Sequence, residues 1–546
     1  MSDQIPQPPG QHEVLTSPGG APVPPGGSSG GRFGGRALVV TGIAVGGAAL
    51  LGGGVWAAIS FLGAGPQPAE ALPDSTIGYV SIDLDPSGKQ KIEGIKTLRK
   101  FEAFRDEVDL DPNADLREEL FDLIQEDAGC DSLDYDDDIE PWIGKRAGFA
   151  AVDLGGDEPV PAIVVQTSSA KKAEDGVKAL KDCLGGDSTG HAIKGDWLIL
   201  AEDQDTADEL LEATEKASLA DDEDYQKWTD EVGDPGFVNL YAAPEAGPYI
   251  ADLVASELGA DTDLTYDDEP VAPDPATEEI EKAFEDFQGM AGTIRFAGGS
   301  VELEVAGQTG DDAVTAAIGA GDAGDDVLAT LPEDTAAAYG VGFGEDWFEP
   351  VVEQLLAATG EESTIDEVVA DLEAESGLAL PEDAETLAGE SLAIALGGNT
   401  DAEAFDSGDP SEIEAGLKVK GEPDDIEQVL DKLRPQAAEE GETLVSEEGD
   451  DGTVAIGMNE SYIGTLTEDG DLGGSDTFQS VVPDADDASS VLFVNFDASD
   501  DWLDTLLRDL GAPEEIVDNV APLSALGLST WTEDGVSHGL LKVTTD

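Results

Sequence analysis

The chain has 546 residues, of which 121 are acidic and 26 are basic, so its formal net charge at pH 7 is −95. A surface with this charge repels nucleic acid and anionic lipid, and neither is expected as a ligand. Hydrophobic residues make up 40% of the chain, which is enough for globular domains with cores of their own.

The first 62 residues predict a membrane anchor. Residues 1–36 are dominated by Pro, Gly and Ser and predict a disordered tail. Ala37–Leu62 contains no ionisable side chain, and as a helix it would reach ~39 Å, more than the ~30 Å of a hydrocarbon core. Because Arg32 and Arg36 precede this span, the positive-inside rule places the tail in the cytoplasm and the rest of the chain outside the cell membrane.

A cleaved signal peptide is the alternative, since Ala69-Glu70-Ala71 has the form of a cleavage site. The apolar stretch is longer than the ~7–15 residues of a cleavable segment, which favours the transmembrane helix. Whether the segment is ever cleaved stays open.

Alternating and helical periodicities predict an α+β body after the span. The expected elements are a strand 77–84, a helix 88–108, a helix 116–127, strands 147–154 and 160–167, a helix 170–184, a strand 197–201, a helix 205–217, a strand 237–242, a long loop 259–277, a helix 278–288, and a hairpin of 292–296 with 301–305 around Gly298-Gly299.

The pattern starts again at Leu331. The run 331–335 and the strand 336–341 match 72–76 and the strand after it, and 387–394 echoes 142–149. A strand 415–419, a helix 424–433 and a final hairpin around 533–535 complete the second pass. We therefore predict two similar α+β repeats with antiparallel sheets, 66–309 and 331–546, joined by a connector at 310–330.

One helix reverses the sign of the charge. The predicted helix 88–108 carries six of the 26 basic residues, namely Lys89, Lys91, Lys96, Arg99, Lys100 and Arg105. They form a candidate patch for an anionic partner such as an envelope polymer. The alternative is that they pair with the protein's own carboxylates and with solvent.

Cys130 and Cys183 are the two cysteines, and both fall on the predicted oxidising side, which makes a Cys130–Cys183 disulfide a candidate. The alternative is two unpaired thiols. Acidic runs at 134–138 and 221–224 are candidate Ca²⁺ ligands, but neither has EF-hand spacing, and Asp469–Gly474 lacks two of the ligands. No specific metal site or cofactor is predicted, only a non-specific affinity for Ca²⁺.

No catalytic motif stands in a suitable context. His191 and His538 are the only histidines in the body. The run 186–190 (GDSTG) has the spacing of a nucleophile elbow, but a helix precedes it and a strand follows it, the reverse of the order that an elbow needs. The interpretation is a turn.

Two runs, Leu72-Pro73-Asp74-Ser75-Thr76 with its strand and Pro141-Trp142-Ile143-Gly144-Lys145-Arg146, together with the basic helix between them, resemble the DUF3352 family. The resemblance implies the same layout: a disordered head, one span and a large repeated ectodomain, in a family with many actinobacterial members. It implies no activity and transfers no functional residues.

From the sequence we expect a membrane-anchored extracytoplasmic protein that is a non-catalytic binding or structural component of the cell envelope. Its oligomeric state stays open. One alternative is a ligand- or lipid-carrying module with an apolar cavity, and the second is a hydrolase with an unrecognised site. A continuous apolar cavity would favour the carrier, and solid cores with an exposed groove would favour the binding protein.

Overall fold

The structure is a computed structural model, and it describes residues 67–83, 88–101, 104–105, 115, 117–118, 121–122, 125, 133–156, 158–184, 189–257, 282, 284–308, 323–344, 347–352, 364–399, 409–483, 485, 488–499, 502–509 and 513–546. The predicted tail and the predicted transmembrane helix Ala37–Leu62 lie outside these residues. Among the helices that are described, none is both long enough and apolar enough to cross a membrane.

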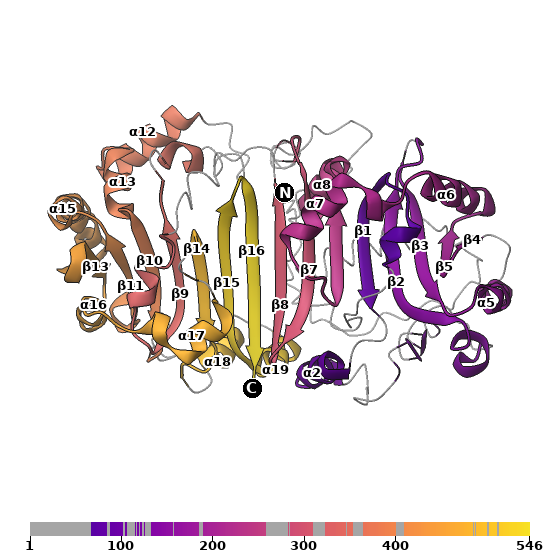
Figure 1. Ribbon diagram of the computed structural model, residues 1–546. Helices are drawn as coiled ribbons and strands as arrows, with labels where there is room; N and C mark the ends of the chain where they lie inside the picture. Colours follow the sequence, from indigo (N-terminus) through magenta and orange to yellow (C-terminus); the bar gives the residue numbers. More distant parts are fainter. Residues whose placement is uncertain are drawn as a thin grey trace, which may run out of the picture.

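One antiparallel sheet of sixteen strands organises the described part of the chain (Figure 1). Its strand order is β12-β13-β11-β10-β9-β14-β15-β16-β8-β7-β6-β1-β2-β3-β5-β4. The α+β class expected from the sequence is confirmed. The expectation of separate sheets is wrong, because β16 pairs directly with β8 and makes the two halves one sheet.

The first half of the chain supplies eight of these strands. They are β1 (Thr76–Asp83), β2 (Ile143–Val152), β3 (Val160–Thr167), β4 (Gly190–Lys194), β5 (Trp197–Ala201), β6 (Val238–Ala242), β7 (Gly289–Ala297) and β8 (Ser300–Gln308). The helices are α2 (Gly88–Leu98), α5 (Ala170–Leu184), α6 (Gln204–Lys216), α7 (Glu223–Glu231) and α8 (Gly247–Glu257), with short turns η1 (Pro68–Ala71), η2 (Tyr135–Ile139), η3 (Leu219–Asp221) and η4 (Pro244–Ala246).

The second half supplies the other eight. They are β9 (Thr335–Gly342), β10 (Ser391–Gly397), β11 (Ala415–Lys420), β12 (Val445–Glu448), β13 (Thr453–Gly457), β14 (Ser490–Asn495), β15 (Leu523–Glu533) and β16 (Val536–Thr545). The helices are α12 (Ile365–Ser376), α13 (Glu382–Ala388), α15 (Pro423–Glu440), α16 (Glu460–Leu466), α17 (Asp476–Val481), α18 (Trp502–Asp509) and α19 (Glu514–Val520), with short turns η5 (Leu328–Thr330), η6 (Pro410–Glu412), η7 (Asp450–Gly452) and η8 (Leu472–Gly474).

The two halves meet in the middle of the sheet in a symmetric register. Reading outward from the middle, the order is 8-7-6-1-2-3-5-4 on one side and 16-15-14-9-10-11-13-12 on the other, so each strand number differs from its counterpart by eight. The turns Gly298-Gly299 and Asp534-Gly535 all have positive φ, as the tightest hairpins require. Glu304 and Leu540, each the fifth residue after its turn, are direct partners.

Short helices cover the face of the sheet that is turned to the viewer in Figure 1, which we call the front face. Two clusters of buried side chains lie under them, one in each half. In the first half α6 contributes Leu210 and α7 contributes Trp228; in the second half α16 contributes Ile463 and α17 contributes Phe478. All four are at most 2% exposed, so these cores are solid.

Other helices cover parts of the opposite face, the back face. The residues Ile95 and Leu98 of α2 pack there with Phe237 and Ile294. Helix α5 and η2 cover β3 and β5, and α13 and α15 cover β11 and β13. Each of these helices buries one apolar side, as amphipathic helices on a sheet do.

Several predicted elements are confirmed. Strand β3, helix α5 and strand β5 have the predicted bounds, and others are shifted by a few residues. The predicted helix 88–108 is interrupted, because α2 ends at Leu98 in a tight turn where Lys100 N donates to Thr97 O, whereas the described residues 104–105 are again helical. Strand β4, α7 and α8 were not predicted. Within the predicted helix 278–288, the described residue 282 is helical and residues 284–286 form a turn. The predicted loop 259–277 lies outside the described residues, as does most of the predicted helix 116–127.

Asp383 fixes the helices that cover the back face at β11. Its Oδ2 accepts a hydrogen bond from Ala379 N at 2.6 Å and contacts Lys432 Nζ, which joins α13 to α15. The Ala379 amide, and after it the Lys432 ammonium, lower the pKa of Asp383 below its ordinary value. A carboxylate with a lowered pKa stabilises the fold above its unfolded-state pKa, and this stabilisation is lost as the pH falls through the folded-state pKa.

We therefore expect Asp383→Asn to lower the free energy of unfolding at neutral pH and to have a vanishing effect in acid. Urea unfolding of the wild type and the variant, followed from about pH 7 to about pH 3, measures this difference. Glu382→Gln removes a neighbouring charge and serves as the control. A difference that is constant over the whole pH range would contradict the assignment.

Candidate functional site

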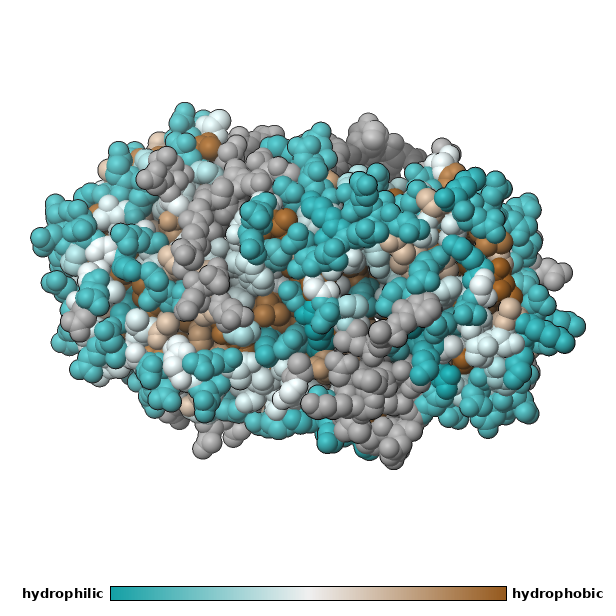
Figure 2. Space-filling model, viewed as in Figure 1, coloured by the Kyte–Doolittle hydropathy of each residue, from teal (hydrophilic) through white to brown (hydrophobic). Residues whose placement is uncertain are grey.

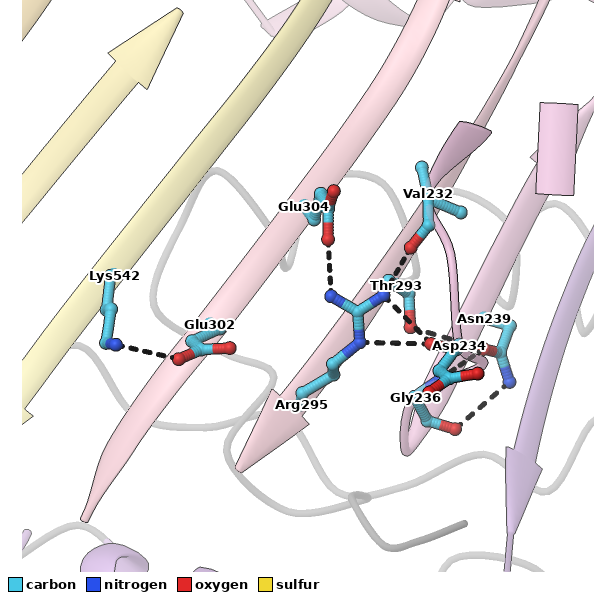
Figure 3. A network of polar contacts seen from close by, with 9 residues as sticks. All are labelled: Val232, Asp234, Gly236, Asn239, Thr293, Arg295, Glu302, Glu304 and Lys542. Carbon is cyan, nitrogen blue, oxygen red and sulfur yellow. Dashed lines mark hydrogen bonds and ion pairs between the residues drawn. The ribbon is translucent and has the colours of Figure 1, made fainter. Parts of the chain in front are cut away.

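The middle of the front face carries a network of charged side chains on β7, β8 and β16 (Figure 3). Arg295 Nε and Nη2 donate to Asp234 O at 3.0 and 2.8 Å, Nη2 also donates to Val232 O, and Nη1 bonds to Glu304. Lys542 Nζ pairs with Glu302 Oε1 at 2.9 Å. Each of the four charged side chains is about one fifth exposed.

This network links the strands of the sheet, and its charged groups are paired within the protein. The three guanidinium nitrogens of Arg295 are all bonded within the protein, so the group clamps the loop after α7 onto β7. The Lys542–Glu302 pair joins directly opposite residues across the central strand pair. The sequence contained a signal for part of it, since opposite charges flank the Gly298-Gly299 turn, but Lys542 lies more than two hundred residues away.

A small pocket with a mixed polar and apolar lining lies beside the network, at the edge of the sheet where β1 ends. Its walls include Gln67, Ser81, Asn239, and the ion pair of Asp83 with Arg146 at 3.4 Å. The pocket is partly open to solvent and has room for about one water molecule. Both charged side chains are 9% exposed, so the pair is a buried structural link between β1 and β2.

The two histidines of the body, His191 and His538, contact structural side chains. His191 Nδ1 lies 3.2 Å from Lys181 Nζ, and burial, followed by this lysine, lowers the pKa of His191. His538 is 7% exposed and stacks on Trp531 with ring centroids 5.0 Å apart. Its Nε2 lies 3.8 Å from Glu231 Oε2. Ser188 of the elbow-like run lies outside the described residues.

Three tyrosines form a buried cluster on the front face of the first half. The rings of Tyr79 and Tyr241 lie 5.9 and 5.1 Å from that of Tyr225 in edge-on contacts. Burial raises the pKa of Tyr79 well above its ordinary value and the pKa of Tyr225 to about 12. These phenols therefore stay neutral at physiological pH and act as core side chains.

The acidic runs use their carboxylates for local structure. Asp134 Oδ1 accepts from Asp137 N, and Asp138 Oδ2 accepts from Asp134 N, so the run 134–138 caps its own turn. Asp469 Oδ1 lies 3.9 Å from Nζ of Lys418, a side chain that is 1% exposed. Within the described ranges, no group of three or more His, Cys, Asp or Glu side chains is placed to hold a metal ion.

The basic residues predicted as an anionic-partner patch are only partly described. Lys96, Arg99 and Arg105 are exposed, and Lys100 Nζ is bonded to Thr545 O and Oγ1, each at 2.9 Å. Arg105 Nη1 donates to the carbonyls of Arg99 and Lys100, which brings these residues together at the end of α2. The side chains of Lys89 and Lys91 lie outside the described part.

Only one of the two cysteines in the predicted disulfide lies in the described part of the chain. Cys183 lies in the last turn of α5 and is disulfide-bonded. Cys130 lies outside the described residues, so the Cys130–Cys183 pairing stays a prediction.

An apolar row crosses the back face from strand to strand. Each member is the direct partner of the next: Ile193, Leu198, Val165, Ala147, Ile82, Val238, Ile294, Leu303, Leu541, Leu528, Leu492, Tyr339, Ile394, Leu417 and Ile456. The row therefore runs through fifteen of the sixteen strands. The alternation of each strand was visible in the sequence, but the order in which the strands pair was not.

The row is most exposed in the second half. Tyr339 is 38% exposed and Ile394 is 49% exposed, and the two are direct partners on β9 and β10. Leu492 and Leu417, which flank them, are partly exposed. We call these four residues the apolar strip. The face seen in Figure 2 is the other one, and it is mostly hydrophilic with small scattered hydrophobic spots.

Residues 34–491 match the family described as "Protein of unknown function (DUF3352)", and the chain belongs to this family. No curated protein and no solved structure matches the chain. The family resemblance expected from the sequence is thus confirmed.

The Lys542–Glu302 pair should contribute measurably to stability because both side chains are largely withdrawn from solvent. A double-mutant cycle of Lys542→Met and Glu302→Gln should give a coupling energy of about 1 kcal/mol in urea unfolding. The same cycle at Lys216 and Glu212, a pair whose side chains are 71% and 73% exposed, should give almost none. Equal coupling at the two pairs would show that the central pair is only a surface contact.

Proposed function

We propose that the protein is a non-catalytic binding protein, held in the cell membrane by the predicted helix Ala37–Leu62 with its acidic body outside the cell. The apolar strip is the observation that carries this proposal. Apolar side chains that are directly adjacent and remain exposed on an otherwise polar, strongly charged protein are typical of interaction surfaces.

The partner that fits the apolar strip is a protein segment with apolar anchors and basic flanking residues. The apolar anchors would cover Tyr339 and Ile394, and the basic flanks suit a chain whose net charge is −95. Aromatic and aliphatic side chains in the middle of a binding surface supply most of the affinity, whereas surrounding charges steer the encounter.

Two features support a binding role over the alternatives. The pocket at Asp83 and Arg146 is small and contains an ion pair, unlike the large apolar cavity that a carrier needs. Of the two histidines of the body, His191 lies beside Lys181 and His538 is buried and stacked on Trp531, and neither position suits a general base.

The carrier alternative keeps one supporting observation, which is the length of the apolar row. An acyl chain lying along Leu541, Leu528 and Leu492 would contact apolar side chains on every strand that it crosses. The test below separates a lipid from a protein on this surface.

We also infer that the body consists of two copies of one α+β unit. The matching strand order and the symmetric pairing of Glu304 with Leu540 support this inference. The helices follow the same order. In the first half α5 lies between β3 and β4, and α6 and α7 lie between β5 and β6. In the second half α15 lies between β11 and β12, and α16 and α17 lie between β13 and β14.

Site-specific photocrosslinking tests the binding role. We expect p-benzoylphenylalanine at position 339 of the full chain, irradiated in intact cells, to give one discrete product with a basic protein. Ile394→Glu in the same chain should reduce it by about tenfold, the loss expected when an anchor worth about 1.4 kcal/mol is removed. Tyr249, which is 50% exposed on α8, is the matched control position.

Equal products from positions 339 and 249 would contradict the proposal, as would a product that Ile394→Glu leaves unchanged. A crosslinked product that contains only lipid would contradict the role as a protein-binding protein and support the carrier alternative.

A further inference from the structure

The chain leaves the predicted membrane helix and enters the core of the body almost at once. Only residues 63–66 separate Leu62 from Gln67. The next residues are already buried: Ala69, Ala71 and Leu72 are at most 1% exposed and belong to the front core. The connection between the predicted anchor and the body is thus only four residues long.

The position of Gln67 decides which edge of the sheet faces the membrane. Gln67 lines the pocket with Asp83, the last residue of β1, and with Gly236, just before β6. Five residue steps from Leu62 reach at most about 18 Å. The headgroup layer on one side of a bilayer is about 5–7 Å thick, so this edge lies within about one to two Debye lengths of the lipid phosphates.

The same edge carries the described end of the basic helix. Ile82, which lines the pocket, also packs against the cluster that Ile95 and Leu98 of α2 build with Phe237. Lys100 ties the end of α2 to Thr545 at the end of β16. Figure 1 accordingly shows α2 and the C-terminus at one edge of the sheet.

The exposed cations at this edge stand out against the charge of the whole chain. Buried positions Ile95 and Leu98 hold one side of α2 on the sheet, while Lys96 and Arg99 remain exposed, and Arg105 is exposed just beyond the helix. A body with a net charge of −95 would be repelled by an anionic membrane, and a cationic edge at the point of attachment offsets that repulsion locally.

We propose that the edge carrying Gln67 and α2 faces the anchoring membrane, and that Lys96, Arg99 and Arg105 contact the phosphate groups of its lipid headgroups. The inference rests on the proposed membrane anchor. The contact would orient this edge of the sheet toward the membrane and keep the apolar strip of β9 and β10 away from the attachment point. The matching chemistry is a cation beside a phosphate diester, with each cation near the surface contributing to an electrostatic attraction that salt screens.

Hydrogen exchange of the full chain in vesicles tests the inference. We expect the peptide amides of 93–105 to exchange several-fold more slowly in vesicles of phosphatidylcholine with phosphatidylglycerol than in phosphatidylcholine alone. The difference should disappear in about 0.5 M NaCl, where the Debye length falls to about 4 Å. Lys96→Glu with Arg99→Glu should abolish it, whereas Lys171→Glu with Lys172→Glu on the exposed side of α5 should leave it unchanged.

Vesicle flotation separates the failure of the inference from the failure of the anchor. If the chain does not float with the vesicles after alkaline washing, the proposed anchor is wrong. If it floats and 93–105 exchange equally in both lipids, the anchor stands and the headgroup contact is wrong. Protection of 93–105 by soluble polyphosphate but not by anionic vesicles would also contradict the contact with lipid. An unchanged melting temperature of each double variant shows that it is folded.

Discussion

The pairing of β8 with β16 is the constraint on which the rest of the structure depends. Each half of the chain ends in a hairpin, and the last strand of each would be an exposed edge if it stood alone. Direct pairing of these two strands removes both edges and creates one sheet of sixteen strands. Lys542 with Glu302 and Arg295 with Glu304 lie at this junction on the front face, and Leu303 with Leu541 lies there on the back face.

The two faces of the sheet differ in how completely their helices cover them. On the front face α6, α7, α16 and α17 close solid cores, and the central charged groups Arg295 and Lys542 are paired within the protein. On the back face α2, α5, α13 and α15 cover separate parts of one apolar row, and Tyr339 and Ile394 remain exposed between them. Buried polar groups that are fully bonded specify a structure, whereas exposed apolar groups provide energy for an interaction. The exposed pair Tyr339 and Ile394 is therefore the feature on which the proposed binding role rests.

Much of the local structure could be predicted from the sequence, because it depends on neighbours along the chain. The alternation of β3, the amphipathic period of α5 and the Gly298-Gly299 turn were sufficient for their elements. The single sheet could not be predicted, because the β8 and β16 pairing joins residues such as Leu303 and Leu541 that the sequence does not link. The apolar strip depends on the same long-range order, so the sequence indicated a binding role without indicating a surface. The basic residues of α2 were visible in the sequence, but the position of α2 at the edge of the sheet where β1 ends was not.

Native-state hydrogen exchange tests most directly whether the junction makes the two halves one cooperative unit. Peptides from β8 and β16 are predicted to exchange with the same free energy of opening as peptides from β1 and β9, because opening the junction requires unfolding of the whole sheet. Exchange of β8 and β16 at a much lower free energy, with β1 and β9 still protected, would show that the halves are independent domains in contact and would contradict the account.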